Sequence, residues 1–173
     1  YKEALRRNIK ALIQEHSPRE LADLSALVGE NILRHPRVQA AHAILLYHSL
    51  PDEVDTRRLI ETLLAQGKQV LLPKVCHDST MTLHAYSGAS SVTVGAYGIM
   101  EPTGPSQPVP PVAVIPGRAF DRQGYRLGRG KGYYDRLLAH AATYKIGICF
   151  PFQFTDTVPH DFHDVPMDEV VTC

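Results

Sequence analysis

The sequence predicts an α/β fold in which a mostly parallel central sheet is covered by helices. A strand, a helix and a second strand follow one another along residues 43–72, an alternation typical of a parallel sheet. The apolar run Val112–Ile115, stopped by a Pro-Gly pair, is typical of a central strand buried on both faces. The 173 residues suit one domain, and no internal repeat or linker divides residues 1–173.

Two helices are predicted before the first strand. Apolar side chains recur at a helical spacing along residues 2–14, at Leu5, Ile9, Leu12 and Ile13. Residues 17–20 combine a serine cap, a proline in the first turn and a glutamate three residues after the cap. This pattern predicts a second helix over about residues 18–33, and a His-Pro pair at residues 35–36 ends it.

The remaining elements follow from short apolar runs and their flanking turn residues. Residues 43–47 predict a buried strand, and residues 87–111, rich in Gly, Pro and Ser, predict a long and often functional loop. One predicted helix is capped by Asp55 or Thr56, extends to Leu64 and stops at Gly67, and another extends from near Tyr133 to about Ala142. The other predicted strands are residues 69–72 (ended by Pro73), 82–86, 145–149 and 169–172.

The composition restricts the classes of partner. Lys and Arg number 18, as do Asp and Glu, so the net charge of zero gives no global attraction to nucleic acid or to an anionic membrane. No apolar stretch approaches the ~20 residues of a membrane span. The three cysteines, Cys76, Cys149 and Cys173, form no CxxC pair and suggest a reducing compartment. We therefore expect a cytoplasmic monomer with small-molecule substrates.

The run Arg-Leu-Gly-Arg-Gly-Lys-Gly-Tyr-Tyr-Asp-Arg at residues 126–136 carries the strongest functional signal. Alternate glycines lie among four cations: Gly128, Gly130 and Gly132, with Arg126, Arg129, Lys131 and Arg136. Glycine lets backbone amides converge, and convergent amides beside cations suit a nucleotide phosphate. The run is not a P-loop, because no Ser or Thr follows Lys131. It is not a dinucleotide fingerprint, since its spacing is GxGxG and no strand is predicted immediately before it. The alternative to a phosphate site is that the whole run is a solvated turn with scattered charge.

Several single residues have both a functional and a structural interpretation. Asp135 is either a helix-start carboxylate or a magnesium ligand beside a nucleotide. His48 and Glu53 follow the first strand, where parallel sheets bind ligands, although Glu53 equally suits a helix N-terminus. Lys2 and Arg6 share a helix face that is either solvated or functional. Near the C-terminus, candidate metal ligands are Asp161, Asp164 and Asp168, and the HxxH pair His160 and His163, which is weak for zinc.

The stretch Val114–Arg136 closely resembles the signature of the 5-formyltetrahydrofolate cyclo-ligase family, and the agreement extends over nearly the full chain. Further matches are a KxxxR motif at residues 2–6, a DExDT-like segment at residues 52–56, a Gly-Ile-x-Glu-Pro element at residues 98–102, and a closing pattern at Pro159, Asp164 and Asp168. The resemblance implies a three-layer α/β/α sandwich similar to the ribose-phosphate isomerase and CoA-transferase-like fold.

The resemblance also implies an enzyme and its site residues. Family members use ATP and Mg²⁺ to close 5-formyltetrahydrofolate into 5,10-methenyltetrahydrofolate through a phosphorylated formyl (imidate) intermediate, with release of ADP and phosphate. The implied ATP contacts are Lys2, Arg6, Arg126, Leu127, Gly128, Arg129, Gly130, Lys131, Gly132, Tyr133 and Tyr134. The implied folate contacts are His48, Glu53, Arg129, Gly130, Lys131, Gly132 and Tyr133. Arg129 and Lys131 are the implied catalytic cations, and Asp135 and Asp164 the implied magnesium ligands.

Two positions depart from the family pattern. Arg118 stands where the family commonly has an apolar residue, and His48 where it often has an apolar or small one. Two other functions remain open at this point. One is a related enzyme that acts on another formyl or pterin-like compound, and the other is a non-catalytic nucleotide- or folate-binding module.

Overall fold

The computed structural model describes residues 1–76, 80–88, 92–94, 100–102 and 104–173. Its centre is a seven-stranded sheet in the order β11-β10-β7-β1-β2-β3-β6. The strands are β1 (Ala43–Leu45), β2 (Gln69–Val75), β3 (Met81–Ala85), β6 (Ser106–Gln107), β7 (Val112–Ile115), β10 (Tyr144–Ile148) and β11 (Glu169–Val171). Pairing is parallel from β11 to β2 and antiparallel where β3 and β6 extend one edge. The predicted α/β fold with a mostly parallel sheet is therefore confirmed.

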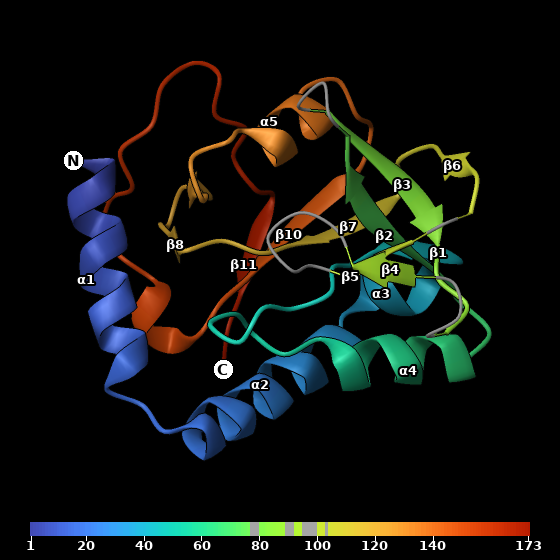
Figure 1. Ribbon diagram of the computed structural model, residues 1–173, viewed down its shortest axis with the longest axis horizontal. Coiled ribbons are helices and arrows are strands. Elements are labelled where there is room, and N and C mark those ends of the chain that lie inside the picture. Colours follow the sequence, from blue (N-terminus) through green and yellow to red (C-terminus); the bar gives the residue numbers. More distant parts are fainter. Residues whose placement is uncertain (77–79, 89–91, 95–99, 103) are drawn as a thin grey trace.

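Helices cover both faces of this sheet (Figure 1). They are α2 (Pro18–Leu33), α3 (Pro36–Ala40), α4 (Arg57–Ala65) and α5 (Tyr133–Leu138), whereas α1 (Lys2–Gln14) lies to one side of the sheet and packs on Ala119, Leu127 and Val158. On one face, a buried cluster joins Val28, Ile32, Ile60 and Leu63 of α2 and α4 to Ile44, Leu72, Val114 and Ile146 of the sheet. On the other face, Leu138 of α5 packs with Leu45, Leu71 and Ile115. The layers are therefore helix, sheet and helix.

The capping signals in the sequence explain where the first helices begin. α1 and α2 have the predicted bounds. Ser17 Oγ accepts the N–H of Glu20 at 3.1 Å, and Glu20 Oε1 accepts the N–H of Ser17 at 2.9 Å, so the capping box forms as predicted. Before α4, the Thr56 hydroxyl donates to the carbonyl of Tyr47, which follows β1. Asp55 Oδ1 instead accepts the N–H of Arg57 at 2.9 Å and serves the helix start.

Three element ends differ from the prediction by two or more residues. β2 continues through Pro73. Its pairing with β1 ends at Leu71, so the missing N–H of Pro73 leaves no hydrogen bond to β1 unmade. β1 ends at Leu45, although the two residues after it remain buried. α5 ends at Leu138, whose side chain lies in the core, and does not reach Ala142.

The prediction of one long loop over residues 87–111 is wrong in part. A hairpin of β4 (Val92–Val94) and β5 (Met100–Pro102) lies within this range, as does β6. The rest of that prediction, and the Gly98 position of the Gly-Ile-x-Glu-Pro element, fall partly on residues 89–91, 95–99 and 103, which lie outside the described residues. Strands this short in a Gly- and Pro-rich stretch leave little periodicity to detect.

A second hairpin joins β8 (Ala119–Phe120) to β9 (Arg126–Leu127), and β9 forms the first two residues of the glycine-rich run. A strand therefore comes directly before the three glycines, and the prediction that no strand immediately precedes the GxGxG spacing is wrong. Asp121 fixes the hairpin: its Oδ1 accepts the N–H groups of Gln123 and Tyr125, both at 3.0 Å, and its Oδ2 accepts that of Val158 at 2.9 Å. A buried aspartate thus holds the strand from which the run departs.

No helix among the described residues is long and apolar enough to cross a membrane. Cys76, Cys149 and Cys173 are all free thiols. The short 3-10 helix η3 (Pro151–Gln153) follows β10.

Candidate active site

A cavity of about 440 Å³ opens at the carboxyl ends of β1, β2 and β7, where parallel sheets bind their ligands. Its walls come from the start of α1, the loop after β1, the ends of β2 and β7, and the glycine-rich run. The sequence-predicted residues that line it are Lys2, Arg6, His48, Glu53, Arg126, Gly128, Arg129, Gly130, Lys131, Gly132, Tyr133, Tyr134, Asp135 and Asp164. Segments 120 or more residues apart in sequence therefore meet around one cavity.

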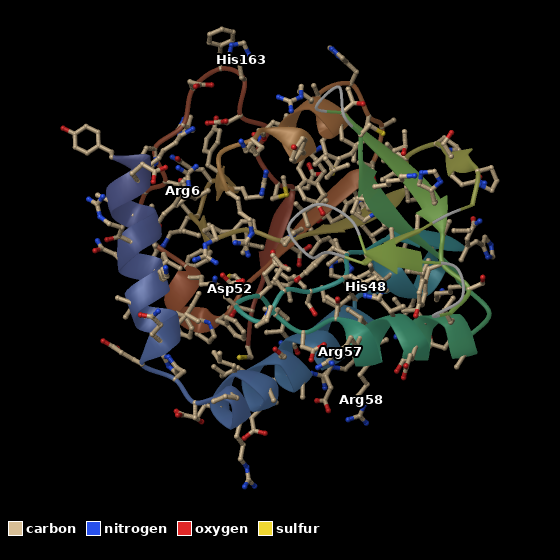
Figure 2. All side chains as sticks on the ribbon, viewed as in Figure 1. Arg6, His48, Asp52, Arg57, Arg58 and His163 are labelled. Carbon is tan, nitrogen blue, oxygen red and sulfur yellow. The ribbon has the colours of Figure 1, made fainter. Side chains whose placement is uncertain are left out.

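The glycine-rich loop, residues 128–132, connects β9 to α5 along one wall. Gly130 and Gly132 have φ angles of 104° and 69°, in the left-handed region that favours glycine. Gly132 is also the residue before the first turn of α5. Arg6 Nε donates to the Gly128 carbonyl at 2.9 Å, so α1 holds the beginning of the loop. Figure 2 shows Arg6 on the side of α1 that faces the interior.

Arg126 is a half-buried cation with unused hydrogen-bonding capacity. Its Nη1 donates to the Pro116 carbonyl at 3.1 Å, and its guanidinium lies 5.2 Å from the centre of the Tyr134 ring. Its Nε is buried and has no partner among the described residues. Burial lowers the pKa of Arg126, while the nearby charges of Asp135 and Asp164 raise it, and an arginine remains protonated under all ordinary conditions. A buried cation with a spare donor beside a cavity suits an anionic ligand.

Arg129 lines the cavity and contacts the loop after β1. Its Nη2 donates to Asp52 Oδ1 at 2.7 Å and lies 3.6 Å from Glu53 Oε2. The other oxygen of Asp52 accepts from Arg118 Nη1 at 2.5 Å. Sequence reasoning did not single out Asp52 as a site residue, although it is the first residue of the DExDT-like segment. This segment and the glycine-rich loop are therefore joined by ion pairs.

Asp135 and Asp164 approach the same end of the cavity. Asp135 Oδ1 accepts the N–H of Val165, the residue after Asp164, at 3.1 Å. Asp164 Oδ2 accepts from Lys2 Nζ at 2.9 Å and from the N–H of Asp161 at 3.0 Å. Burial alone would raise the pKa of Asp164, but the hydrogen bond and charge of Lys2 lower it below its ordinary value.

The donor set fits magnesium held together with a nucleotide. No group of three or more His, Cys, Asp or Glu side chains suited to a metal occurs in the described part of the chain. Magnesium commonly uses one or two carboxylates and completes its six oxygens with phosphate and water. Asp135 and Asp164 supply such a pair beside the glycine-rich loop, whereas the described residues offer no third protein ligand for a metal held without a nucleotide.

Glu53 and His48 line the same cavity, together with the apolar side chains of Leu50, Pro73, Val75 and Met81. Glu53 Oε1 accepts the N–H of Leu50 at 2.8 Å, and burial raises the pKa of Glu53 in spite of this bond and the nearby Arg129. The ring of His48 meets that of Tyr86 edge-on at 5.2 Å. Burial lowers the pKa of His48, which favours the neutral ring, and its buried Nε2 has no partner among the described residues.

Replacing Glu53 with glutamine is expected to stabilise the protein at neutral pH. Because the pKa of Glu53 is raised in the folded state, its protonated form stabilises the fold below the ordinary value of 4.5, and this stability is lost as the pH rises through the raised value. Glutamine removes the buried charge and keeps the acceptor for Leu50. We expect a gain on the order of 1 kcal/mol, or about 3 °C in Tm, at pH 7.

The check on this prediction is the pH dependence of the gain. Thermal unfolding of both proteins should give a difference in Tm that shrinks as the pH falls toward 4, where wild-type Glu53 is itself protonated. A variant less stable than wild type at pH 7 would show that the ionised carboxylate stabilises the fold.

Some candidate residues lie outside the cavity. Leu127 is buried in the cluster of Ile9, Ala119 and Val158, so its side chain serves packing. Asp168 pairs with Lys145 at 3.3 Å. Among the described residues, the HxxH pair belongs to no group of three or more metal ligands. The ring of His160 stacks on Tyr125 with 3.4 Å between centres, and Figure 2 shows His163 on an outer loop.

Comparisons with known proteins find matches along nearly the whole chain. The model of the 5-formyltetrahydrofolate cyclo-ligase family matches residues 1–173. The 5-formyltetrahydrofolate cyclo-ligase of Escherichia coli strain K12 is 31% identical, with 90% of this chain and 91% of that protein aligned. The mouse (Mus musculus) enzyme of the same name is 28% identical over 98% and 92% of the two chains. The NMR structure of 5,10-methenyltetrahydrofolate synthetase from Aquifex aeolicus superposes with a TM-score of 0.88 at 36% identity, covering 99% of this chain and 89% of that one.

Proposed function

Because the chain belongs to the 5-formyltetrahydrofolate cyclo-ligase family, we propose that it uses ATP and Mg²⁺ to close 5-formyltetrahydrofolate into 5,10-methenyltetrahydrofolate, with release of ADP and phosphate. The observation that carries this proposal is the makeup of the single cavity described above. Its lining combines a glycine-rich loop, several cations and two carboxylates with the largely buried carboxylate of Glu53 and several apolar side chains. Such a lining suits a nucleotide triphosphate bound beside a pterin.

The proposed chemistry activates a poor leaving group. The formyl oxygen attacks the γ-phosphorus of ATP, the bond from that phosphorus to ADP breaks, and a phosphorylated imidate forms. The neighbouring folate nitrogen then attacks the formyl carbon and loses its proton, and the carbon–oxygen bond breaks to release phosphate. Little covalent work falls to the protein, so its contribution is positioning and stabilisation of charge on the phosphoryl group.

The glycine-rich loop and the cations are assigned to the triphosphate. Backbone amides at Gly130 and Gly132 can approach phosphate oxygens closely, since glycine has no side chain. Arg129 presents a planar fork for bidentate contact, whereas Lys131 supplies a mobile point charge. Asp135 and Asp164 would hold the magnesium ion, which supplies neutralisation of the phosphate charge when bound.

For the folate, Glu53 is assigned to hydrogen bonding with the pterin, and His48 and Tyr133 to lining the ring. The unpartnered Nε2 of His48 and the raised pKa of Glu53 both support a polar ligand that completes their hydrogen bonds. The same proposal places a monomeric enzyme in the cytoplasm. The free thiols of Cys76, Cys149 and Cys173 support the cytoplasmic location.

The proposed function is tested by mixing the protein with 5-formyltetrahydrofolate and Mg-ATP. We expect the absorbance of 5,10-methenyltetrahydrofolate to grow, with one ADP formed per product. Omitting ATP, or adding a chelator of magnesium, should stop the growth. Folded protein that forms no product from this mixture would contradict the proposal, and ATP turnover with a different formyl compound would redirect it to another substrate.

A further inference from the structure

Asp52 is shared by two arginines that approach it from different parts of the fold. Its Oδ1 accepts from Arg129 of the glycine-rich loop at 2.7 Å, and its Oδ2 accepts from Arg118 of the β7–β8 connection at 2.5 Å. Burial alone would raise the pKa of Asp52, but the two guanidinium groups lower it, so the carboxylate is ionised. One negative charge therefore serves two positive ones.

The two arginines differ in how firmly they are bound to this position. The side chain of Arg118 is 9% exposed, whereas that of Arg129 is 41% exposed. The backbone N–H of Arg118 also donates to the Leu127 carbonyl at 2.7 Å, which fixes its place beside β9. In the described part of the chain, Asp52 is the one carboxylate within ion-pair distance of Arg118. Since an unpaired buried charge costs several kcal/mol, Arg118 stays with Asp52, and Arg129 is the partner able to leave.

This asymmetry matters because Arg129 has to reach a second anion. On the proposed function, which this inference presupposes, Arg129 must exchange its carboxylate partners for phosphate oxygens when Mg-ATP binds. We propose that Arg118 is a positioning residue that neutralises Asp52, so that Asp52 holds Arg129 weakly enough to release it to the triphosphate. Without Arg118, the full charge of Asp52 would act on Arg129 alone, and nucleotide binding would have to break a stronger ion pair.

The test measures Mg-ATP binding by isothermal titration calorimetry, without folate, across a double-mutant cycle. Arg118→Met is expected to weaken ATP binding about tenfold, because groups in one salt-bridge network are strongly coupled. Adding Asp52→Asn to that variant removes the carboxylate that would hold Arg129, and should restore binding to within about threefold of wild type. Arg118→Lys keeps the charge and should bind almost as wild type. A residue that only supports the fold would not be rescued by losing its partner.

Arg57, which directly follows the DExDT-like segment, provides a matched control. Arg57 pairs with Asp55 at 2.6 Å, but its side chain is 76% exposed and it does not line the cavity. Figure 2 shows Arg57 and Arg58 pointing away from the interior. Arg57→Met also removes an Arg–Asp ion pair, but one at the surface, and should leave ATP affinity unchanged. Arg118→Gln is a second neutral variant should Arg118→Met fold poorly, which thermal unfolding will show.

The outcomes separate this inference from the proposed function. Wild-type protein that binds no Mg-ATP contradicts both. Wild-type protein that binds Mg-ATP, with Arg118→Met and Arg118→Gln binding equally well, overturns the inference alone. A double variant that binds no better than Arg118→Met also overturns it, because the loss would then not act through Asp52.

Discussion

Replacing Arg129 with alanine is expected to lower kcat by about 10³-fold, while the affinity for 5-formyltetrahydrofolate falls far less. The reason is the position of its guanidinium between the glycine-rich loop and the carboxylates of Asp52 and Glu53. Once it exchanges these carboxylates for phosphate oxygens, it can meet the charge that develops on the transferred phosphoryl group, and a contact realised mainly in the transition state acts on kcat. The measurement is a steady-state assay, combined with folate binding by calorimetry.

Two controls separate this role from support of the fold. Arg129→Lys keeps a positive charge but loses the bidentate fork, so its rate should fall between those of alanine and wild type. Thermal unfolding should show little loss for Arg129→Ala, because Arg118 remains to neutralise Asp52. An alanine variant that turns over at the wild-type rate would refute the assignment of Arg129 to phosphoryl transfer.

The sequence was informative where the signal is local. The capping box at Ser17 and the apolar spacing of α1 and α2 are set by residues three or four positions apart, and their bounds were predicted correctly. The glycine-rich loop was recognised because its unusual composition is contiguous. The error at Pro73 arose because a local rule took no account of where pairing with the neighbouring strand ends.

Long-range polar contacts could not be predicted in this way. Asp52 and Arg118 are 66 residues apart, and a single ion pair leaves no periodicity in either segment. Both residues were seen only as motif positions, Asp52 within the DExDT-like segment and Arg118 as a departure from a family pattern. The meeting of Lys2 with Asp164 is a similar case, since it depends on α1 lying beside a loop from the other end of the chain.

Replacing Asp135 with asparagine is expected to raise the magnesium concentration required for half-maximal rate by roughly 30-fold, since even groups outside the immediate ligand shell alter metal affinity by 10- to 100-fold. The substitution is nearly isosteric, and the amide oxygen can still accept the N–H of Val165, so the fold should keep its stability. What is lost is one of the two negative charges assigned to the metal, a loss that excess magnesium can partly offset.

The measurement is a magnesium titration at fixed ATP, with Asp161→Asn as the control, because Asp161 is exposed and does not line the cavity. A wild-type titration for Asp135→Asn would assign Asp135 to the start of α5 alone, whereas a lower rate that no magnesium concentration restores would indicate that it also orients the phosphates.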